Sequence, residues 1–251
     1  MIYERPRFLP GGDGALYVEF GNAIDPELNR RVRQCQLAIQ KAGPPWLVET
    51  VPTYRSLLVY YRPLRASPSE VRSQLEALAC DAESGRVPQP AVTDIPVAYG
   101  GEYGPDLGFV ARHNGLPRDE VVRLHSDRAY LIYMLGFIPG FAYLGGMSSR
   151  IATPRLATPR AKIPAGSVGI AGDQTGIYPT ESPGGWRLIG RTPLQLFHPL
   201  KEPPALLRMG DYVRFVPVTA QEFTDIQEQV EQGAYLAKKT SLRPEGQVGD
   251  I

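Results

Sequence analysis

A chain of 251 residues is long enough to fold as one large domain or two smaller ones, and we expect two. Its 27 lysines and arginines nearly balance its 26 aspartates and glutamates, so no global field would attract nucleic acid or an anionic membrane surface. The expected partner is a small molecule or another protein. The first residues lack the pattern of a secretory leader, and we expect a cytoplasmic protein.

The first part of the chain alternates strand-like and helical segments. Residues 14–21 have the pattern of a strand, and Asp25, followed by a proline, supplies the N-cap of a helix. Two short β-rich runs within residues 47–63 precede a capping box at Ser67, which begins a second helix. This order predicts helices packed on an antiparallel sheet, an α+β N-terminal domain over residues 1–88.

The two cysteines, Cys35 and Cys80, lie on the apolar stripes of these two predicted helices. A thiol at such a position usually behaves as a small buried hydrophobe. We therefore expect neither a disulfide nor a metal bound by cysteine.

A change of amino-acid composition marks the end of the first domain. Residues 83–94 mix glycine, serine and two prolines with few large apolar groups, and we predict the domain boundary there. From residue 129 to 218, short apolar runs alternate with glycine and proline, which predicts an all-β barrel or sandwich. A capping box at residues 219–222 begins a C-terminal helix, so the second domain spans residues 89–240. Residues 241–251 are expected to be a disordered tail.

One apolar run is long enough to cross a membrane on length alone. Residues 129–149 carry no charge, but Pro139 and the pair Gly145 and Gly146 would break a lone helix in lipid. We interpret the run as a buried strand followed by an apolar loop. The later run at residues 194–197 is interpreted as a further barrel strand.

Several familiar catalytic patterns are absent or incomplete. No stretch fits G-x-x-x-x-G-K-[ST], so ATP binding by that route is not expected. Residues 165–169 fall one residue short of a nucleophile elbow, and β-rich residues follow, which argues against Ser167 as a nucleophile. His113, His125 and His198 lie far apart without metal-ligand spacing, and we expect surface or capping histidines.

A basic run is more informative. Arg150, Arg155, Arg160 and Lys162 alternate with threonines and prolines over a short span. Arginine side chains bind carboxylates or phosphates through two parallel hydrogen bonds. From charge alone, a ligand-binding surface and a solvated loop both remain open.

An aromatic loop lies just before this basic run. Phe137, Phe141 and Tyr143 stand beside glycines, an arrangement that suits a pocket wall or a partner interface. Packing in the barrel core is the alternative, and we favour it for Phe137.

Three segments resemble one known family. They are residues 136–147 (GFIPGFAYLGGM), residues 150–197 and residues 208–218 (RMGDYVRFVPV). In this order they strongly resemble the family of the B subunit of 5-oxoprolinase, which also includes the kinase A inhibitor protein and allophanate hydrolase subunit 1. The likeness extends from about residue 3 to residue 230. It implies an α+β N-terminal domain followed by a cyclophilin-like β-barrel domain.

The resemblance also implies a function. The chain would be one subunit of an ATP-dependent 5-oxoprolinase, which cleaves 5-oxo-L-proline to L-glutamate, with the A and C subunits as partners and ATP as co-substrate of the complex. Two alternatives remain open: an inhibitor of a sporulation-type histidine kinase, and subunit 1 of an allophanate hydrolase. We favour the role in 5-oxoprolinase because 5-oxoproline forms spontaneously from glutamine and needs disposal.

The candidate ligand site combines the basic run with the signature segment at residues 170–186. Phosphorylation of a lactam oxygen creates an anionic centre, which needs cations and hydrogen-bond donors around it. No catalytic residue is assigned and no metal site is expected. The candidate ligand-binding residues are Arg155, Arg160, Lys162, Gln174, Thr175, Tyr178, Ser182 and Trp186.

Overall fold

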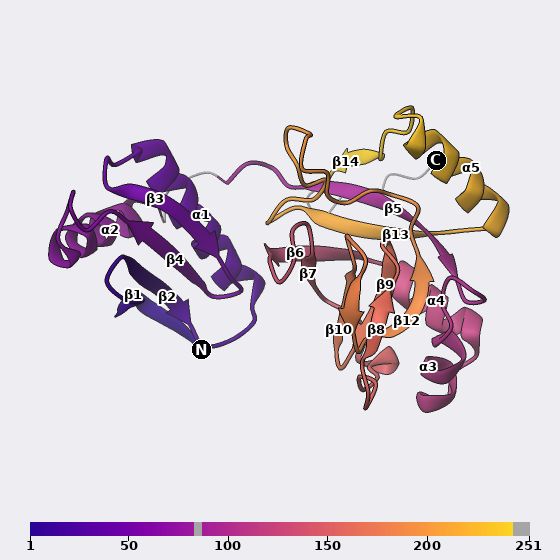
Figure 1. Cartoon of the computed structure of the whole chain (residues 1–251). Coiled ribbons are helices and arrows are strands. Elements are labelled where there is room, and N and C mark those ends of the chain that lie inside the picture. The colour runs from indigo at the N-terminus through magenta and orange to yellow at the C-terminus, as the bar shows by residue number, and fades with distance from the viewer. Residues whose placement is uncertain (83–86, 243–251) are drawn as a thin grey trace, which may run out of the picture. The chain divides into compact units, whose positions relative to one another are not determined.

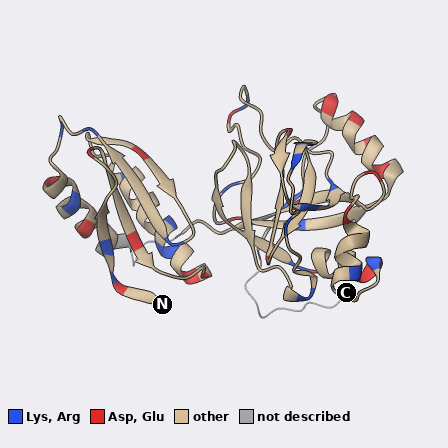
Figure 2. Cartoon of the chain, turned by 60° about the horizontal axis from the view of Figure 1, so that its bottom comes forward, with Lys and Arg blue, Asp and Glu red and all other residues tan. Residues whose placement is uncertain are grey.

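The computed structural model describes residues 1–82 and 87–242, apart from the side chains of residues 80–82. The chain divides into two compact units, residues 1–88 and residues 89–251. Both units carry acidic and basic residues interspersed along their helices and strands (Figure 2). The side chain of Cys80 and most of the expected disordered tail lie outside the described residues.

The first unit is a four-stranded antiparallel sheet with two helices that pack on it and on each other (Figure 1). The sheet order is β1-β2-β4-β3. This arrangement confirms the predicted α+β architecture. Its elements are β1 (Ile2–Pro10), β2 (Ala15–Gly21), α1 (Pro26–Ala42), β3 (Leu47–Pro52), β4 (Ser56–Tyr61) and α2 (Pro68–Ala82).

Local sequence signals set the bounds of α1. The Asp25 carboxylate accepts the main-chain N–H groups of Glu27 at 2.8 Å and Leu28 at 3.2 Å, which caps the first turn. Gly43 ends the helix in a left-handed conformation, with φ of 55°. Burial raises the pKa of the Cys35 thiol to about 12, so it is an inert core group. The fully buried stripe is Leu28, Val32, Cys35 and Ile39.

The second unit is a closed seven-stranded β-barrel, which confirms the predicted barrel (Figure 1). Its strands follow the order β12-β9-β10-β7-β6-β13-β5, and the end of β5 pairs back to β12. The start of β5 also pairs with β14, outside the closed ring. The barrel strands are β5 (Ala91–Tyr99), β6 (Ala129–Leu135), β7 (Ala142–Gly145), β9 (Ser167–Ala171), β10 (Gln174–Ile177), β12 (Arg187–Arg191), β13 (Tyr212–Val218) and the added β14 (Lys239–Ser241).

The second unit also contains helices and a short two-stranded β-ribbon. A two-stranded ribbon pairs β8 with β11, and a capping box between Thr219 and Glu222 starts α5, as predicted. Among the described residues, no helix combines the length and apolar character needed to span a bilayer. These elements are α3 (Leu107–His113), α4 (Arg118–Ser126), a 3-10 turn (Ser149–Ile151), β8 (Arg160–Ile163), β11 (Ser182–Gly184) and α5 (Ala220–Glu231).

The prediction of a strand at residues 194–197 is wrong. Only Phe197 pairs in this run, through an isolated bridge to Ala205. Pro193 and Pro199 flank the run, and each lacks the N–H that a continuing ladder would need.

A buried chain of hydrogen bonds surrounds His125 in the barrel core. Tyr99 Oη lies 2.7 Å from Nδ1, and Thr175 Oγ1 lies 2.7 Å from Nε2. Because the Thr175 hydroxyl donates its proton to the Gly169 carbonyl at 3.1 Å, it accepts from Nε2, and Nδ1 then accepts from Tyr99. Burial lowers the pKa of His125 to about 3, so the ring is neutral at pH 7. The expectation of a surface or capping histidine is therefore wrong for His125.

Candidate functional site

A pocket of about 210 Å³ lies in the second unit, and most of its walls are aromatic rings. We call it the aromatic pocket. It brings together six side chains that the sequence analysis singled out, from the loop after β6 to the connection between β11 and β12. Its lining residues are Phe137, Phe141, Tyr143, Arg155, Tyr178, Pro183, Gly184, Gly185 and Trp186.

Phe141 is the centre of the aromatic pocket and is only 2% exposed. Its ring meets four others edge to face, with centroid distances of 5.7 Å to Phe137, 5.2 Å to Tyr143, 5.7 Å to Tyr178 and 5.7 Å to Trp186. Aromatic pairs favour this geometry because the positive edge of one ring faces the negative face of the other. These contacts pack the Phe141 ring against four neighbours at the floor of the pocket.

Phe137 stands at the exposed side of the pocket, and its assignment to the barrel core is wrong. The residue is 68% exposed. It lies in the turn that the Gly136 N–H closes on the Phe141 carbonyl at 3.1 Å. Within the described part of the chain, it is the one non-glycine residue with positive φ, at 71°. Such a conformation costs about 1–3 kcal/mol and often occurs at functional sites.

Arg155 is the cation of the aromatic pocket. Its guanidinium carbon lies 5.9 Å from the centroid of the Trp186 ring. No carboxylate of the described residues lies within ion-pair distance of it, unlike three other cations of the basic run. Those ion pairs are Arg150 with Glu120 at 3.2 Å, Arg160 with Asp106 at 2.9 Å and Lys162 with Glu181 at 3.0 Å.

Tyr178 forms a buried wall of the pocket. Burial raises its pKa, while a hydrogen bond with the Trp186 main chain and the charges of Arg155 and Arg160 act in the opposite direction. The phenol is therefore protonated at neutral pH. Its hydroxyl approaches Gly184 so closely that a Cβ there would lie 2.4 Å from it, which makes a side chain at this position incompatible with the present geometry.

The other candidate ligand-binding residues lie outside this lining. The Arg160 and Lys162 side chains are held by the ion pairs described above. Thr175 is fully buried in the hydrogen-bond chain of the core, and Gln174 lies half-buried at the start of β10. Ser182 belongs to the strand that leads into the pocket, and its buried hydroxyl has no hydrogen-bond partner among the described residues.

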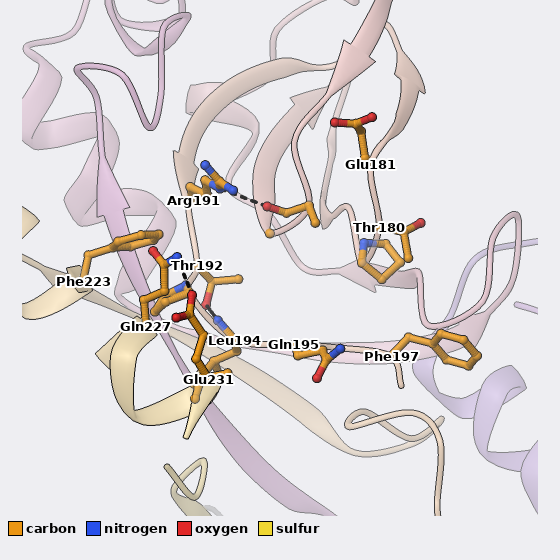
Figure 3. Close-up of a pocket in the computed structure, with 15 residues that line it drawn as sticks. Thr180, Glu181, Arg191, Thr192, Leu194, Gln195, Phe197, Phe223, Gln227 and Glu231 are labelled. Atoms are coloured by element: carbon orange, nitrogen blue, oxygen red, sulfur yellow. Dashed lines mark hydrogen bonds between the residues drawn. The ribbon is translucent and has the colours of Figure 1, made fainter. Parts of the chain in front are cut away.

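A larger cavity of about 510 Å³ lies beside α5 (Figure 3). Gln227 and Glu231 of α5 line it together with Arg191, whose Nε donates to the Ala165 carbonyl at 2.9 Å. The Gln227 amide donates to Glu231 at 3.0 Å. Glu181 also lies in the lining, which therefore holds two carboxylates and one arginine, and this balance of charge does not suit a polyphosphate.

Sequence reasoning missed this larger cavity because its walls come from segments that are far apart in the chain. No local motif marks them. Within the residues that the structure describes, no group of three or more histidine, cysteine, aspartate or glutamate side chains is placed to hold a metal ion.

A family model and two named relatives indicate one and the same family. The family of carboxyltransferase domains, subdomains C and D, matches residues 6–207. The B subunit of 5-oxoprolinase from Bacillus subtilis (strain 168) is 44% identical over 232 residues, which cover 87% of this chain and 95% of the relative. The protein of the same name in Escherichia coli O157:H7 is 42% identical over 214 residues, 85% of this chain and 97% of the relative.

A solved structure is also similar. The crystal structure of a protein named TTHA0988 matches with a TM-score of 0.74 and 38% identity, over 82% of this chain and 40% of that chain. More than half of TTHA0988 therefore lies outside the region that resembles this protein. On the family match and the two relatives above, this chain belongs to the 5-oxoprolinase B-subunit family of carboxyltransferase domains.

Proposed function

We propose that this chain is one subunit of an ATP-dependent 5-oxoprolinase, which opens 5-oxo-L-proline to L-glutamate. The observation that carries the proposal is the identity of 44% and 42% with relatives of that name, over 95% and 97% of their lengths. Neither relative is named as a kinase inhibitor or as part of an allophanate hydrolase. The role in 5-oxoprolinase is therefore favoured over both alternatives.

The chemistry explains why ATP is the co-substrate. Resonance makes a lactam carbon a poor electrophile, and transfer of a phosphoryl group from ATP to the lactam oxygen activates it. Water then attacks this carbon, the ring C–N bond breaks to leave an acyl phosphate, and a second water releases inorganic phosphate. Neither of the two pockets described above has the cations that a triphosphate needs, so we assign ATP to a site that the partner proteins supply or complete.

Among the candidate residues, those of the aromatic pocket are the proposed ligand-binding group. They share one cavity, whereas the Arg160 and Lys162 side chains are engaged by carboxylates. The proposed ligand-binding residues are Arg155, Tyr178 and Trp186, with Phe137, Phe141 and Tyr143.

The A and C subunits of the enzyme are the proposed partners. The chain spans 40% of TTHA0988, so in that protein a matching region is joined to a longer remainder. A separate chain of this family would obtain the equivalent of such a remainder by association. We place the complex in the cytoplasm, where ATP is available.

A genetic experiment tests the proposed function. Deletion of the gene in the cell that encodes it should make 5-oxoproline accumulate and prevent its use as a nitrogen source. Return of the intact gene should reverse both effects. An unchanged 5-oxoproline level in the deletion strain would contradict the proposal, and a change in kinase signalling alone would favour the inhibitor.

A further inference from the structure

We propose that the aromatic pocket binds the 5-oxoproline ring and that Arg155 pairs with its carboxylate. This inference rests on the proposed function, because that function supplies the ligand. The pocket volume of about 210 Å³ lies below the roughly 300–1,000 Å³ of sites for drug-sized molecules. A compact ring is therefore the size of ligand that it suits, and a nucleotide is too large.

The walls suit a flat five-membered ring. Phe141, Tyr178 and Trp186 are each at most 8% exposed and fix one another edge to face. A lactam ring placed against these surfaces would bury its apolar faces, and its polar edge would point away from the aromatic rings. The pre-formed walls keep the ordering cost of binding low.

Arg155 supplies the charge that this ligand requires. Its guanidinium carbon lies 5.9 Å from the centroid of the Trp186 ring, at the outer limit of a cation–π contact, and no described carboxylate competes for it. A guanidinium can bind a carboxylate through two parallel hydrogen bonds, which also sets the orientation of the ring.

Phe137 completes the pocket on its exposed side. Its ring meets Phe141 at 5.7 Å and 81°, yet it is 68% exposed, whereas Phe141 beside it is 2% exposed. A bound ring would cover part of this exposed surface, which favours binding through the hydrophobic effect. In this arrangement the bound ligand packs against Phe137 and covers the exposed side of the pocket.

The two tryptophans make a direct optical test possible. Trp186 lines the pocket, and Trp46 lies buried in the first unit, where its indole N–H donates to Gln74 at 2.9 Å. In a Trp46→Phe chain, all tryptophan fluorescence comes from Trp186. Titration with L-5-oxoproline should give a saturable change in this signal. Calorimetric titration of the unsubstituted chain gives the same affinity without relying on that variant.

Two ligands and two variants isolate the carboxylate contact. Arg155→Gln should weaken 5-oxoproline binding at least tenfold and leave the weaker binding of 2-pyrrolidinone, which lacks the carboxylate, unchanged. Arg150→Gln is the matched control, because Arg150 belongs to the same basic run but pairs with Glu120 outside the pocket. It should bind 5-oxoproline as the parent does.

Kinetics of the complex with its partner proteins separate this inference from the proposed function. Arg155→Gln should raise the KM for 5-oxoproline at least tenfold, with the KM for ATP unchanged. If the complex forms glutamate but the variant keeps the parental KM and affinity, the pocket assignment is overturned and the proposed function stands. If the chain binds 5-oxoproline through Arg155 but no complex forms glutamate, the pocket assignment stands and the proposed function is overturned.

Discussion

Asp106 and Arg160 are joined by two parallel contacts: Nη1 lies 2.9 Å from Oδ2, and Nη2 lies 3.0 Å from Oδ1. Oδ2 also accepts the Leu188 main-chain N–H at 2.7 Å, and Asp106 is 8% exposed. One carboxylate therefore connects the start of α3 with β8 and β12. Arg160, a candidate for ligand binding by its sequence context, has a structural partner.

Removal of this carboxylate should destabilise the barrel unit. We expect Asp106→Ala to lower the free energy of unfolding by about 3 kcal/mol, because it leaves a partly buried guanidinium and a buried N–H without their acceptor. Urea unfolding measures the change. The control is Glu181→Ala, which removes the exposed partner of Lys162 and should cost less than about 1 kcal/mol. Equal losses in the two variants would contradict this account.

The buried His125 should make stability depend on pH. Its pKa is about 3 in the folded chain against its usual 6.5, so the unfolded state binds more protons between these values. The free energy of unfolding should therefore fall as the pH drops below 6.5, by up to about 1.4 kcal/mol per pH unit from this group. Above that pH the contribution is constant.

Chemical unfolding at several pH values between 5 and 7 measures this slope. His125→Gln removes the titrating ring, so its curve should lack this part of the slope, whatever its absolute stability. The same slope in the parent and in the variant would show that His125 is not buried in its neutral form.

Two adjacent glycines offer a matched test of the pocket geometry. Gly184→Ala would place a Cβ 2.4 Å from the Tyr178 hydroxyl, whereas at Gly185 the nearest atoms lie 3.7 Å away. We expect Gly184→Ala to cost about 1–3 kcal/mol of stability through overpacking and to shift Trp186 fluorescence. Gly185→Ala should leave both close to the parent. Wild-type stability and fluorescence in Gly184→Ala would contradict the close approach.

Phe137 should show a conflict between stability and binding. Phe137→Gly removes the strain of a positive φ and should raise stability by about 1 kcal/mol or less, since the exposed ring adds little to the core. Phe137→Ala keeps the strain and should gain no stability. Both variants should bind 5-oxoproline more weakly, because both remove the exposed ring. Thermal unfolding and the Trp186 titration measure the two effects, and binding by either variant as strong as that of the parent would exclude the proposed contact between Phe137 and the ligand.

Local sequence signals predicted the elements whose ends are set by neighbouring residues. Asp25 and Gly43 bound α1 because capping depends on residues within one turn of the helix end. The strand β1 was not predicted, because charged residues and prolines interrupt its sequence, which therefore lacks apolar alternation. Its register comes from pairing with β2. Tertiary pairing therefore supplied what the local pattern could not.

The same distinction holds for the candidate site. Tyr178 and Trp186 belong to the signature segment, whereas Phe141 and Arg155 come from other parts of the chain. Sequence context identified each of them but could not show that all four line one cavity. The partners of Arg160 and His125 lie 54 and 50 residues away in the chain, at Asp106 and Thr175. No spacing rule connects residues at such separations, so their engagement became visible only in the fold.

Turnover by the reconstituted enzyme tests the central claim most directly. The purified A and C subunits together with this chain should convert 5-oxo-L-proline to L-glutamate and form ADP in equal amounts. Omission of this chain should abolish glutamate formation, and its return should restore it. Equal glutamate formation with and without this chain would contradict its role in the enzyme.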